Sequence, residues 1–368
     1  MLRVFEAFAG VGAQRMALRN LGIEHEVVGI SEIDKFAIQS YEAIHGETLN
    51  FGDISKINPT DLPDFDLFTY SFPCQDLSVA GKQQGMVKGQ TRSGLLYECE
   101  KMIEAKRPKY LLLENVKNLV GKRFKLDFEE WLAYLESLGY TNYWQVLNAK
   151  DYNIPQNRER VFVVSILGEH EPYHFPKAQK LEWCLGDFLE TSVDETYFIN
   201  QPFQLLDKPV TETNLIQEIG LLPYLSHSPH SSQNSIIYST EGNDSTSSAT
   251  ESNHSTKVII PTIVQAALLK DVTFHQNANV QGVQGCARTV CARDWKGPQR
   301  ILVESEKGYR VRKLTPLEYW RLMGFSDADY FKVKNSGISN TQLYKQAGNS
   351  IVVSVLEGIF KSLFLNEI

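Results

Sequence analysis

The stretch Val4-Phe5-Glu6-Ala7-Phe8-Ala9-Gly10-Val11-Gly12 joins a short apolar run to a turn that is rich in small residues. The apolar run predicts a buried strand, and the amphipathic residues 13–21 that follow predict a helix. Small residues between a strand and a helix let backbone N–H groups approach a ligand at the start of that helix. A dinucleotide fingerprint needs a glycine three positions after Gly12, where this chain has Arg15, so a nicotinamide site is disfavoured.

The alternation of strand and helix continues through the first 170 residues. It predicts an α/β fold with a doubly wound, mostly parallel sheet that carries helices on both faces and binds ligands at the carboxyl ends of its strands. Further strands are expected at 27–30, 67–70, 110–113 and 161–166, and further helices at 35–44, 94–106 and 128–138.

The alternation weakens after residue 175 and returns near Arg312. Residues 226–256 contain eleven serines and few core-forming side chains, which is typical of a flexible loop. Amphipathic helices are expected again at 317–323 and 352–364. The chain is therefore divided into the first part of the α/β domain (1–175), a smaller, irregular, β-rich insert (176–307) and a return to the α/β domain (308–368).

Composition and charge limit the function classes. The 368 residues are 42% hydrophobic and carry a net charge of −7, as in an ordinary globular protein. No apolar run approaches the roughly 20 residues that span a membrane, and the N-terminus lacks the layout of a signal peptide, so a cytoplasmic protein is expected. The five scattered cysteines exclude a disulfide framework, and none has zinc-ligand spacing, so no metal site is expected. The segment 288–313 has eight basic and three acidic residues, which favours contact with phosphates.

Acidic residues follow two of the early strands. Glu32 lies twenty residues beyond Gly12, at the end of the second expected strand, where a carboxylate suits a ribose diol. Asp53, in Gly52-Asp53-Ile54, is a second acidic position near a strand end. Each alone is more often a helix cap, but their order and spacing favour an adenosine-type ligand.

The third expected strand leads into Ser71-Phe72-Pro73-Cys74-Gln75. Cys74 fits either a small core residue or a nucleophile at the end of a strand, with its direction fixed by Pro73. A free thiol has a pKa of about 8.5, so such a nucleophile needs help to ionise near neutral pH. The glycine-rich residues 76–95 are typical of a mobile loop that closes over a substrate.

Charged residues also border the fourth and fifth expected strands. Glu114, in Glu114-Asn115-Val116, fits either a cap or a carboxyl that holds a heterocycle through a ring nitrogen and an exocyclic amine. Arg158 and Arg160 fit either a solvated turn or a pair that orients an anion or a substrate carbonyl.

Two stretches near the end of the chain border expected helices. Thr315, Pro316 and Glu318 predict the N-cap, the first position and the capping box of a helix. Gly348-Asn349-Ser350 precedes the last helix and by itself fits a simple turn.

Together these motifs resemble those of the cytosine-C5 DNA methyltransferases. The resemblance covers about 1–175 and 308–368, and the motifs stand in the family's order. It implies a fold of the S-adenosylmethionine-dependent methyltransferase type, with the insert as a target-recognition domain. The matching motifs are Phe8–Gly12, Glu32, Gly52–Ile54, Phe72–Gln75, Glu114–Val116, Gln156–Arg160, Arg312–Pro316 and Gly348–Ser350.

The resemblance implies S-adenosylmethionine as the cofactor. Phe8 is then expected to pack on the adenine, Glu32 to bind the ribose hydroxyls and Asp53 to accept from the adenine amine. Ile33 stands where many members have an aromatic residue beside the adenine, which suggests a weaker affinity for the same cofactor. The other implied cofactor-binding residues are Ala9, Gly10, Gly12, Ile54 and Pro73, with Asn349 and Ser350 near the methionine part.

The resemblance also implies the chemistry. The thiolate of Cys74 adds to C6 of a flipped-out cytosine, which lets C5 take a methyl group. Glu114 holds N3 and the exocyclic amine, and Arg160, beside Arg158, contacts the base O2 or a nearby phosphate. Double-stranded DNA is the expected partner, contacted by Ser78, Gln83 and Arg92 after Cys74 and by Arg288, Thr289, Arg293 and Arg312.

Three other kinds of protein differ from this expectation in their motifs or in the size of their middle region. RNA (tRNA) cytosine-C5 methyltransferases resemble this chain in their motifs but have a compact middle region, whereas about 130 residues separate residue 175 from Arg312 here. A non-catalytic DNA-binding relative is expected to lose Cys74 or Glu114, and a cysteine hydrolase needs a histidine partner that the motifs lack. We therefore expect a monomeric, site-specific DNA methyltransferase in a restriction-modification or phage-protection setting. Any cognate restriction endonuclease would act separately, and the protein would join the nucleoid when bound to DNA.

Overall fold

The computed structural model describes residues 1–73, 93–200, 203–206, 237–238, 265–268, 279–305 and 308–365. The expected roles of Cys74, Ser78, Gln83 and Arg92, and nearly all of the predicted serine-rich loop, lie outside the described residues. The chain divides into two compact units. Unit 1 comprises 1–182, 288–295 and 319–368, and unit 2 comprises 183–287 and 296–318.

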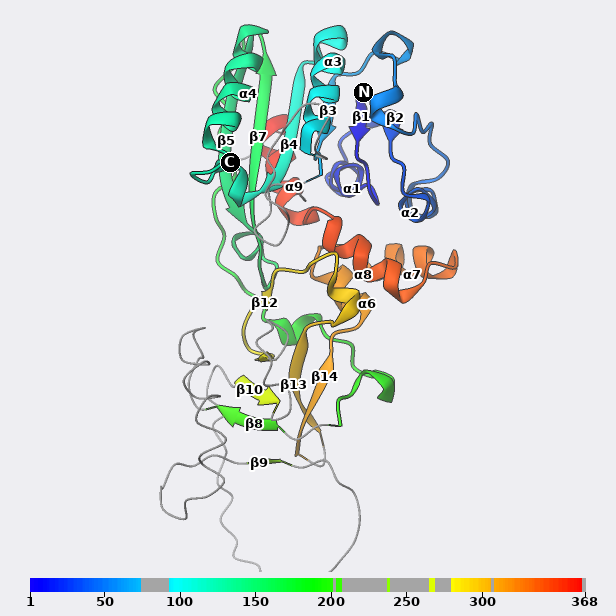
Figure 1. The fold of residues 1–368 in the computed structure, drawn as a ribbon, viewed down its shortest axis with the longest axis vertical. Coiled ribbons are helices and arrows are strands. Elements are labelled where there is room, and N and C mark those ends of the chain that lie inside the picture. Colours follow the sequence, from blue (N-terminus) through cyan, green and yellow to red (C-terminus); the bar gives the residue numbers. More distant parts are fainter. Residues whose placement is uncertain are drawn as a thin grey trace, which may run out of the picture. The chain divides into compact units, whose positions relative to one another are not determined.

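Unit 1 is built on a six-stranded sheet with the strand order β2-β1-β3-β4-β7-β5 (Figure 1). Parallel pairs join β1 to β2, β1 to β3 and β3 to β4, whereas β7 runs antiparallel to β4 and β5. The predicted α/β class with a mostly parallel sheet is confirmed. The strands are β1 (Leu2–Ala7), β2 (His25–Ser31), β3 (Leu67–Tyr70), β4 (Tyr110–Val116), β5 (Tyr140–Asn148) and β7 (Glu159–Leu167), and the short β6 (Gln156–Asn157) precedes β7.

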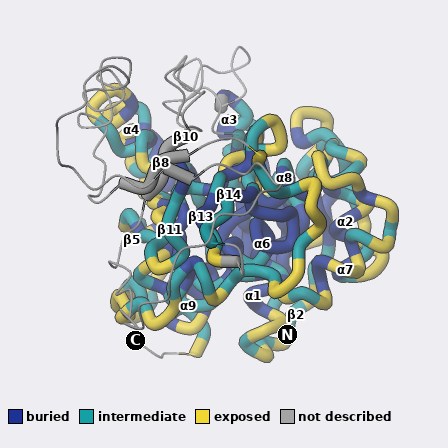
Figure 2. Tube along the Cα trace, turned by 90° about the horizontal axis from the view of Figure 1, so that it is seen from below, coloured by how far each residue is buried: buried dark blue, intermediate teal, exposed yellow. Residues whose placement is uncertain are grey.

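Helices cover both faces of this sheet. Phe5, Leu111 and Val163 belong to one core cluster with the buried residues of α3 and α4. On the opposite face, Glu6 is hydrogen-bonded to residues of α1 and α2. There α1 packs against α9 and α2 against α7, and buried and exposed residues alternate along α2 and α7 (Figure 2). The helices are α1 (Ala13–Asn20), α2 (Lys35–His45), α3 (Leu96–Lys106), α4 (Lys125–Ser137), α7 (Asp327–Asn335), α8 (Asn340–Asn349) and α9 (Val353–Phe364).

The structure differs from the sequence expectation at β5 and β7. β5 was not predicted, because polar residues interrupt this edge strand and leave no apolar run, and only Tyr140 and Leu147 in it are buried. The predicted strand at 161–166 belongs to β7, but it is antiparallel. Only residues 149–158 connect β5 to β7, fewer than the dozen or more that a parallel crossover needs. The antiparallel direction places the start of β7 at the carboxyl end of β4.

Unit 2 contains a second six-stranded sheet, with the order β14-β13-β11-β10-β8-β9. Its strands are β8 (Phe203–Leu206), β9 (Ile237–Tyr238), β10 (Gln265–Leu268), β11 (Asn279–Gly282), β13 (Arg300–Ser305) and β14 (Gly308–Lys313). β12 (Ala287–Arg288) and α6 (Pro316–Arg321) lie where the chain passes from one unit to the other. The predicted capping box of α6 is confirmed, because Thr315 N–H donates to Glu318 Oε2 (2.8 Å) and Glu318 N–H donates to Thr315 Oγ1 (3.2 Å).

The segment Asn340–Phe364 is long and apolar enough to cross a membrane by length and composition alone. It consists of α8 and α9, which are separated by a non-helical step at Ser350–Val352. Within unit 1, α9 packs against α1, and 44% of the most apolar window of the segment is buried inside the protein. One such segment is weak evidence for a membrane span.

Candidate active site

A cavity of about 310 Å³ lies at the carboxyl ends of β1 to β4 in unit 1. This is the edge at which α/β sheets bind ligands, and the volume suits a small-molecule site. The cavity brings together residues predicted from separate motifs. Its lining includes Phe8, Ala9, Gly10, Glu32, Ile33, Asp53, Ile54, Pro73, Glu114, Arg158, Arg160, Asn349 and Ser350.

The turn after β1 has left-handed backbone at Phe8, Gly10 and Gly12 (φ 56°, 58° and 76°). This conformation is unusual for a residue with a side chain, and such residues cluster at functional sites. Gly12 does not line the cavity. A Cβ atom at Gly12 would lie 2.5 Å from His45 Nε2, so glycine is needed there for packing beneath the turn.

Two acidic residues lie at the edge of the cavity, as the sequence predicted. Backbone N–H groups hold the carboxylate of Glu32: Gly10 donates to Oε2 (2.9 Å), and Ile33 and Asp34 donate to Oε1 (2.8 Å each). Hydrogen bonds from the hydroxyl and N–H of Ser55 lower the pKa of Asp53, so this carboxylate stays an ionised acceptor. The Ile33 side chain is 74% exposed, which leaves an apolar surface on the cavity lining.

The sequence reasoning missed an ion pair on the cavity lining. Lys345 Nζ in α8 lies 2.6 Å from Asp34 Oδ2, and Asp34 Oδ1 caps α2 by accepting from Phe36 N–H. Burial raises the pKa of Asp34, but the hydrogen bond and charge of Lys345 outweigh it, and the net shift is downward. The cap position marks Asp34 in the sequence, but no local signal marks Lys345, which is 311 residues away.

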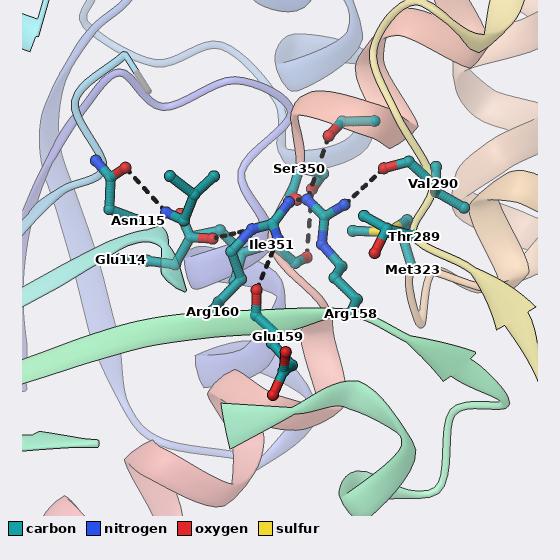
Figure 3. A network of polar contacts seen from close by, with 12 residues as sticks. Glu114, Asn115, Arg158, Glu159, Arg160, Thr289, Val290, Met323, Ser350 and Ile351 are labelled. Atoms are coloured by element: carbon teal, nitrogen blue, oxygen red, sulfur yellow. Dashed lines mark hydrogen bonds and ion pairs between the residues drawn. The ribbon is translucent and has the colours of Figure 1, made fainter. Parts of the chain in front are cut away.

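Glu114 and Arg160 lie side by side at the carboxyl end of β4 (Figure 3). Arg160 Nε is 3.1 Å from Glu114 Oε1, and the side chains are 17% and 11% exposed, respectively. Burial raises the pKa of Glu114, while the charges of Arg160 and Arg158 oppose this effect without cancelling it. A raised pKa favours the protonated form of a carboxyl, and that form can donate a hydrogen bond.

Asn115 ties the end of β4 to the segment after β3. Its buried side chain donates from Nδ2 to the carbonyl of Phe72 (3.1 Å) and accepts at Oδ1 from Val116 N–H (2.9 Å). Phe72 precedes Pro73, the last described residue before Cys74. Asn115 therefore holds the chain in place two residues before the predicted nucleophile.

Arg158 differs from Arg160 in what it contacts. Its guanidinium donates to three backbone carbonyls, those of Val290 (2.7 Å), Gly348 (3.2 Å) and Ser350 (2.8 Å), and its side chain is buried (Figure 3). These bonds hold protein segments together.

The residues predicted to contact DNA also fall into different environments. Arg312 is 3% exposed and forms two hydrogen bonds with the carboxylate of Glu318 (2.8 and 2.6 Å), which gives it a structural role in unit 2 and does not support contact with DNA. Thr289 Oγ1 donates to the carbonyl of Asn157 (2.7 Å). Arg293 is exposed and Arg288 is half-buried, both in unit 1.

The doubly wound sheet, its left-handed glycine turn and the acidic residues at its strand ends define an α/β methyltransferase fold. The family model described as C-5 cytosine-specific DNA methylase matches residues 2–365. A type II methyltransferase of Lactococcus lactis subsp. cremoris, M2.ScrFI, is 40% identical, with all of both chains covered. The orphan methyltransferase M.SPBetaI of Bacillus phage SPbeta is 35% identical over 98% of this chain and 97% of its own. The solved structure of S. pombe Dnmt2 methyltransferase covers 100% of this chain and 99% of its own, with 18% identity and a TM-score of 0.65, and shows the same fold. The chain therefore belongs to the C-5 cytosine-specific DNA methylases, which are methyltransferases that act on DNA.

Proposed function

We propose that this protein transfers a methyl group from S-adenosylmethionine to C5 of a flipped-out cytosine at a specific DNA sequence, through a covalent bond between Cys74 and C6. The observation that carries this proposal is the shared cavity. Its lining includes the acidic residues suited to an adenosine, the Glu114–Arg160 pair and Pro73, the neighbour of Cys74.

The cavity residues fit the cofactor. Glu32 and Asp53 supply fixed carboxylate oxygens for ribose hydroxyls and an adenine amine, and Phe8 and Ile33 supply apolar surface for a ring. Asn349 and Ser350 line the same cavity and are assigned to the methionine part. When bound, S-adenosylmethionine supplies an electrophilic methyl group on a sulfonium.

The chain's own residues then act on the base. The Cys74 thiolate adds to C6, which makes C5 electron-rich enough to take the methyl group that the bound cofactor would supply from its sulfonium. A protonated Glu114 donates to N3 and accepts from the exocyclic amine, and this stabilises the charge that develops on the ring. Arg160 keeps Glu114 in position and reaches the base O2 or its phosphate. Loss of the C5 proton to a base then expels the thiolate.

The setting is proposed from the relatives. The two relatives above are named as a type II methyltransferase and a phage orphan methyltransferase, which suggests modification of DNA either beside a restriction enzyme or for phage protection. We infer that the protein acts as a cytoplasmic monomer that associates with the nucleoid through DNA. An RNA substrate and a non-catalytic role remain the alternatives that the experiment must separate.

Bisulfite sequencing of genomic DNA from cells that express the protein tests this function. Methylated cytosine in one sequence context is expected with the wild type, and none with Cys74→Ser. Duplexes that contain 5-fluorocytosine test the covalent step. The bond between Cys74 and C6 is expected to persist on them, since fluorine at C5 cannot leave as a proton does. Unmethylated DNA together with methylated tRNA would support the RNA alternative. Full activity of Cys74→Ser would overturn the mechanism.

A further inference from the structure

A short segment of unit 1, Arg288–Trp295, is here called the strap. Both flanking segments of the chain belong to unit 2. The strap is held by its backbone at Val290: Gln156 Oε1 accepts from Val290 N–H (2.9 Å), and Arg158 Nη1 donates to the Val290 carbonyl (2.7 Å). Val290 is fully buried, and the neighbouring hydroxyl of Thr289 donates to the Asn157 carbonyl. Three consecutive residues, 156 to 158, thus hold two consecutive residues of the strap.

Arg158 also binds the part of the cavity lining formed by Gly348–Ser350, here called the wall. Its Nη2 atom donates to the carbonyls of Gly348 (3.2 Å) and Ser350 (2.8 Å). A charged donor makes stronger hydrogen bonds than a neutral one, and the Arg158 side chain is buried from water. One guanidinium therefore joins the strap to the wall (Figure 3).

Gly348 supplies a second, independent contact between the same two segments. A Cβ atom at this position would lie 2.1 Å from the backbone nitrogen of Ala292 and 2.2 Å from the carbonyl carbon of Cys291. Both contacts are with backbone, which cannot move aside as a flexible side chain can. The strap therefore lies directly against the wall and leaves space for glycine alone.

We propose that Gln156 and Arg158 are positioning residues that make the strap and the wall one mechanical unit, so that a ligand in the cavity orders the strap. Within the motif Gln156–Arg160, Gln156 and Arg158 then position the strap and the wall, and Arg160 acts at the reacting base. The inference rests on the proposed function for one point, which is that the ligand is S-adenosylmethionine or its product. A ligand that orders the wall also favours an ordered strap, because the bonds from Arg158 to both segments form only when both are in place.

Hydrogen-exchange mass spectrometry of the full chain tests the proposal, with S-adenosylhomocysteine as the probe. In the wild type, the probe is expected to slow exchange of the strap amides by about tenfold, a typical size for coupling between sites. Arg158→Lys keeps the positive charge but cannot reach three carbonyls. In this variant the probe-induced slowing is expected to disappear, while calorimetry still detects probe binding. Gly348→Ala, which pushes the strap away, is expected to give the same result with Arg158 intact.

Arg3→Lys is the matched control, because Arg3 forms an exposed ion pair with Asp66 away from the cavity. It should keep the full slowing of strap exchange. Equal slowing in wild type and Arg158→Lys would overturn the proposal, as would probe binding to the wild type without any change in the strap. Failure of the wild type to bind the probe would contradict the proposed cofactor and, with it, the proposed coupling between the cavity and the strap. If Arg158 had a purely structural role, its replacement would not change the effect of the probe on strap exchange. This effect therefore distinguishes a positioning role from a structural one.

Discussion

Glu114 in β4 and Arg160 in β7 are diagonal neighbours across an antiparallel strand pair, in which Val116 lies opposite Arg160 and Glu114 lies opposite Phe162. Diagonal neighbours project on the same face of a sheet, within reach of long side chains. The 3.1 Å contact between Arg160 Nε and Glu114 Oε1 therefore follows from the direction of β7. A parallel β7 would start at the opposite edge of the sheet.

Replacing Glu114 by Gln is expected to lower kcat by at least about a hundredfold, the usual cost of losing a preorganised group at a developing charge. Gln keeps the size of the side chain and can hydrogen-bond N3 through its amide N–H, but it cannot transfer a proton to N3 as charge develops on the ring. Because the pKa of Glu114 is raised and its protonated form is the active one, the ratio of the wild-type single-turnover rate to that of Glu114→Gln should fall as pH rises through that pKa, since ionisation of Cys74 affects both proteins alike. Glu159→Gln, which alters an exposed ion pair between Glu159 in β7 and Lys117 just after β4, is the control. An unchanged rate in Glu114→Gln would contradict the assigned role.

Replacing Glu32 by Gln is expected to weaken S-adenosylhomocysteine binding about tenfold while leaving kcat at saturation nearly unchanged. The amide nitrogen cannot accept from the N–H groups that now bind both carboxylate oxygens, so the contact with the ribose is lost or displaced. Titration calorimetry measures the affinity, and Glu26→Gln, an exposed change in β2, the strand that precedes Glu32, is the control. Equal affinity in wild type and Glu32→Gln would remove Glu32 from the cofactor site.

Replacing Arg312 by Met is expected to lower the free energy of unfolding by about 3–5 kcal/mol, because it leaves the fully buried Glu318 carboxylate without its partner. The double change Arg312→Met with Glu318→Gln should recover part of this loss, since it also removes the buried charge. Urea unfolding measures both. Normal stability of Arg312→Met combined with weakened DNA binding would restore the predicted role of Arg312 at the DNA.

The wild type is expected to lose stability as pH rises from about 4.5 to about 7, through Glu6. Burial raises the pKa of Glu6 from 4.5 to about 7, against hydrogen bonds from Tyr41 and Arg15, so the folded state holds a proton that the unfolded chain releases. The stability that this proton contributes is fully present below pH 4.5 and is lost as pH rises to about 7. The change approaches about 3 kcal/mol.

Glu6→Gln isolates this effect. The variant carries no proton at this position, so its free energy of unfolding should change less than that of the wild type between pH 5 and pH 8. His45, whose pKa burial lowers to about 3, contributes the opposite trend below pH 6.5 equally in both proteins. Thermal unfolding at several pH values gives the difference between the two proteins. Parallel curves would show that Glu6 does not titrate in this range.

Much of the candidate site could be read from the sequence because each residue follows a recognisable strand. Glu32 and Glu114 each stand at or just beyond the end of an apolar run, and parallel strands bring their carboxyl ends to one edge. The capping box of Thr315 and Glu318 was predictable for a similar reason, since all of its partners lie within four residues. Arg158 was not separable from Arg160 in this way, because both are arginines in one motif.

The sequence by itself determined the α/β class, the edge of the sheet at which the cavity lies and the local caps, since these depend on periodicity and on near neighbours along the chain. Only the tertiary structure decided the direction of β7, the Lys345–Asp34 pair and the three carbonyls that Arg158 binds. The physical reason is that every residue has a backbone carbonyl. An arginine that binds carbonyls of distant segments therefore leaves no mark in the residue types of its partners, and only the folded chain brings them within hydrogen-bonding distance.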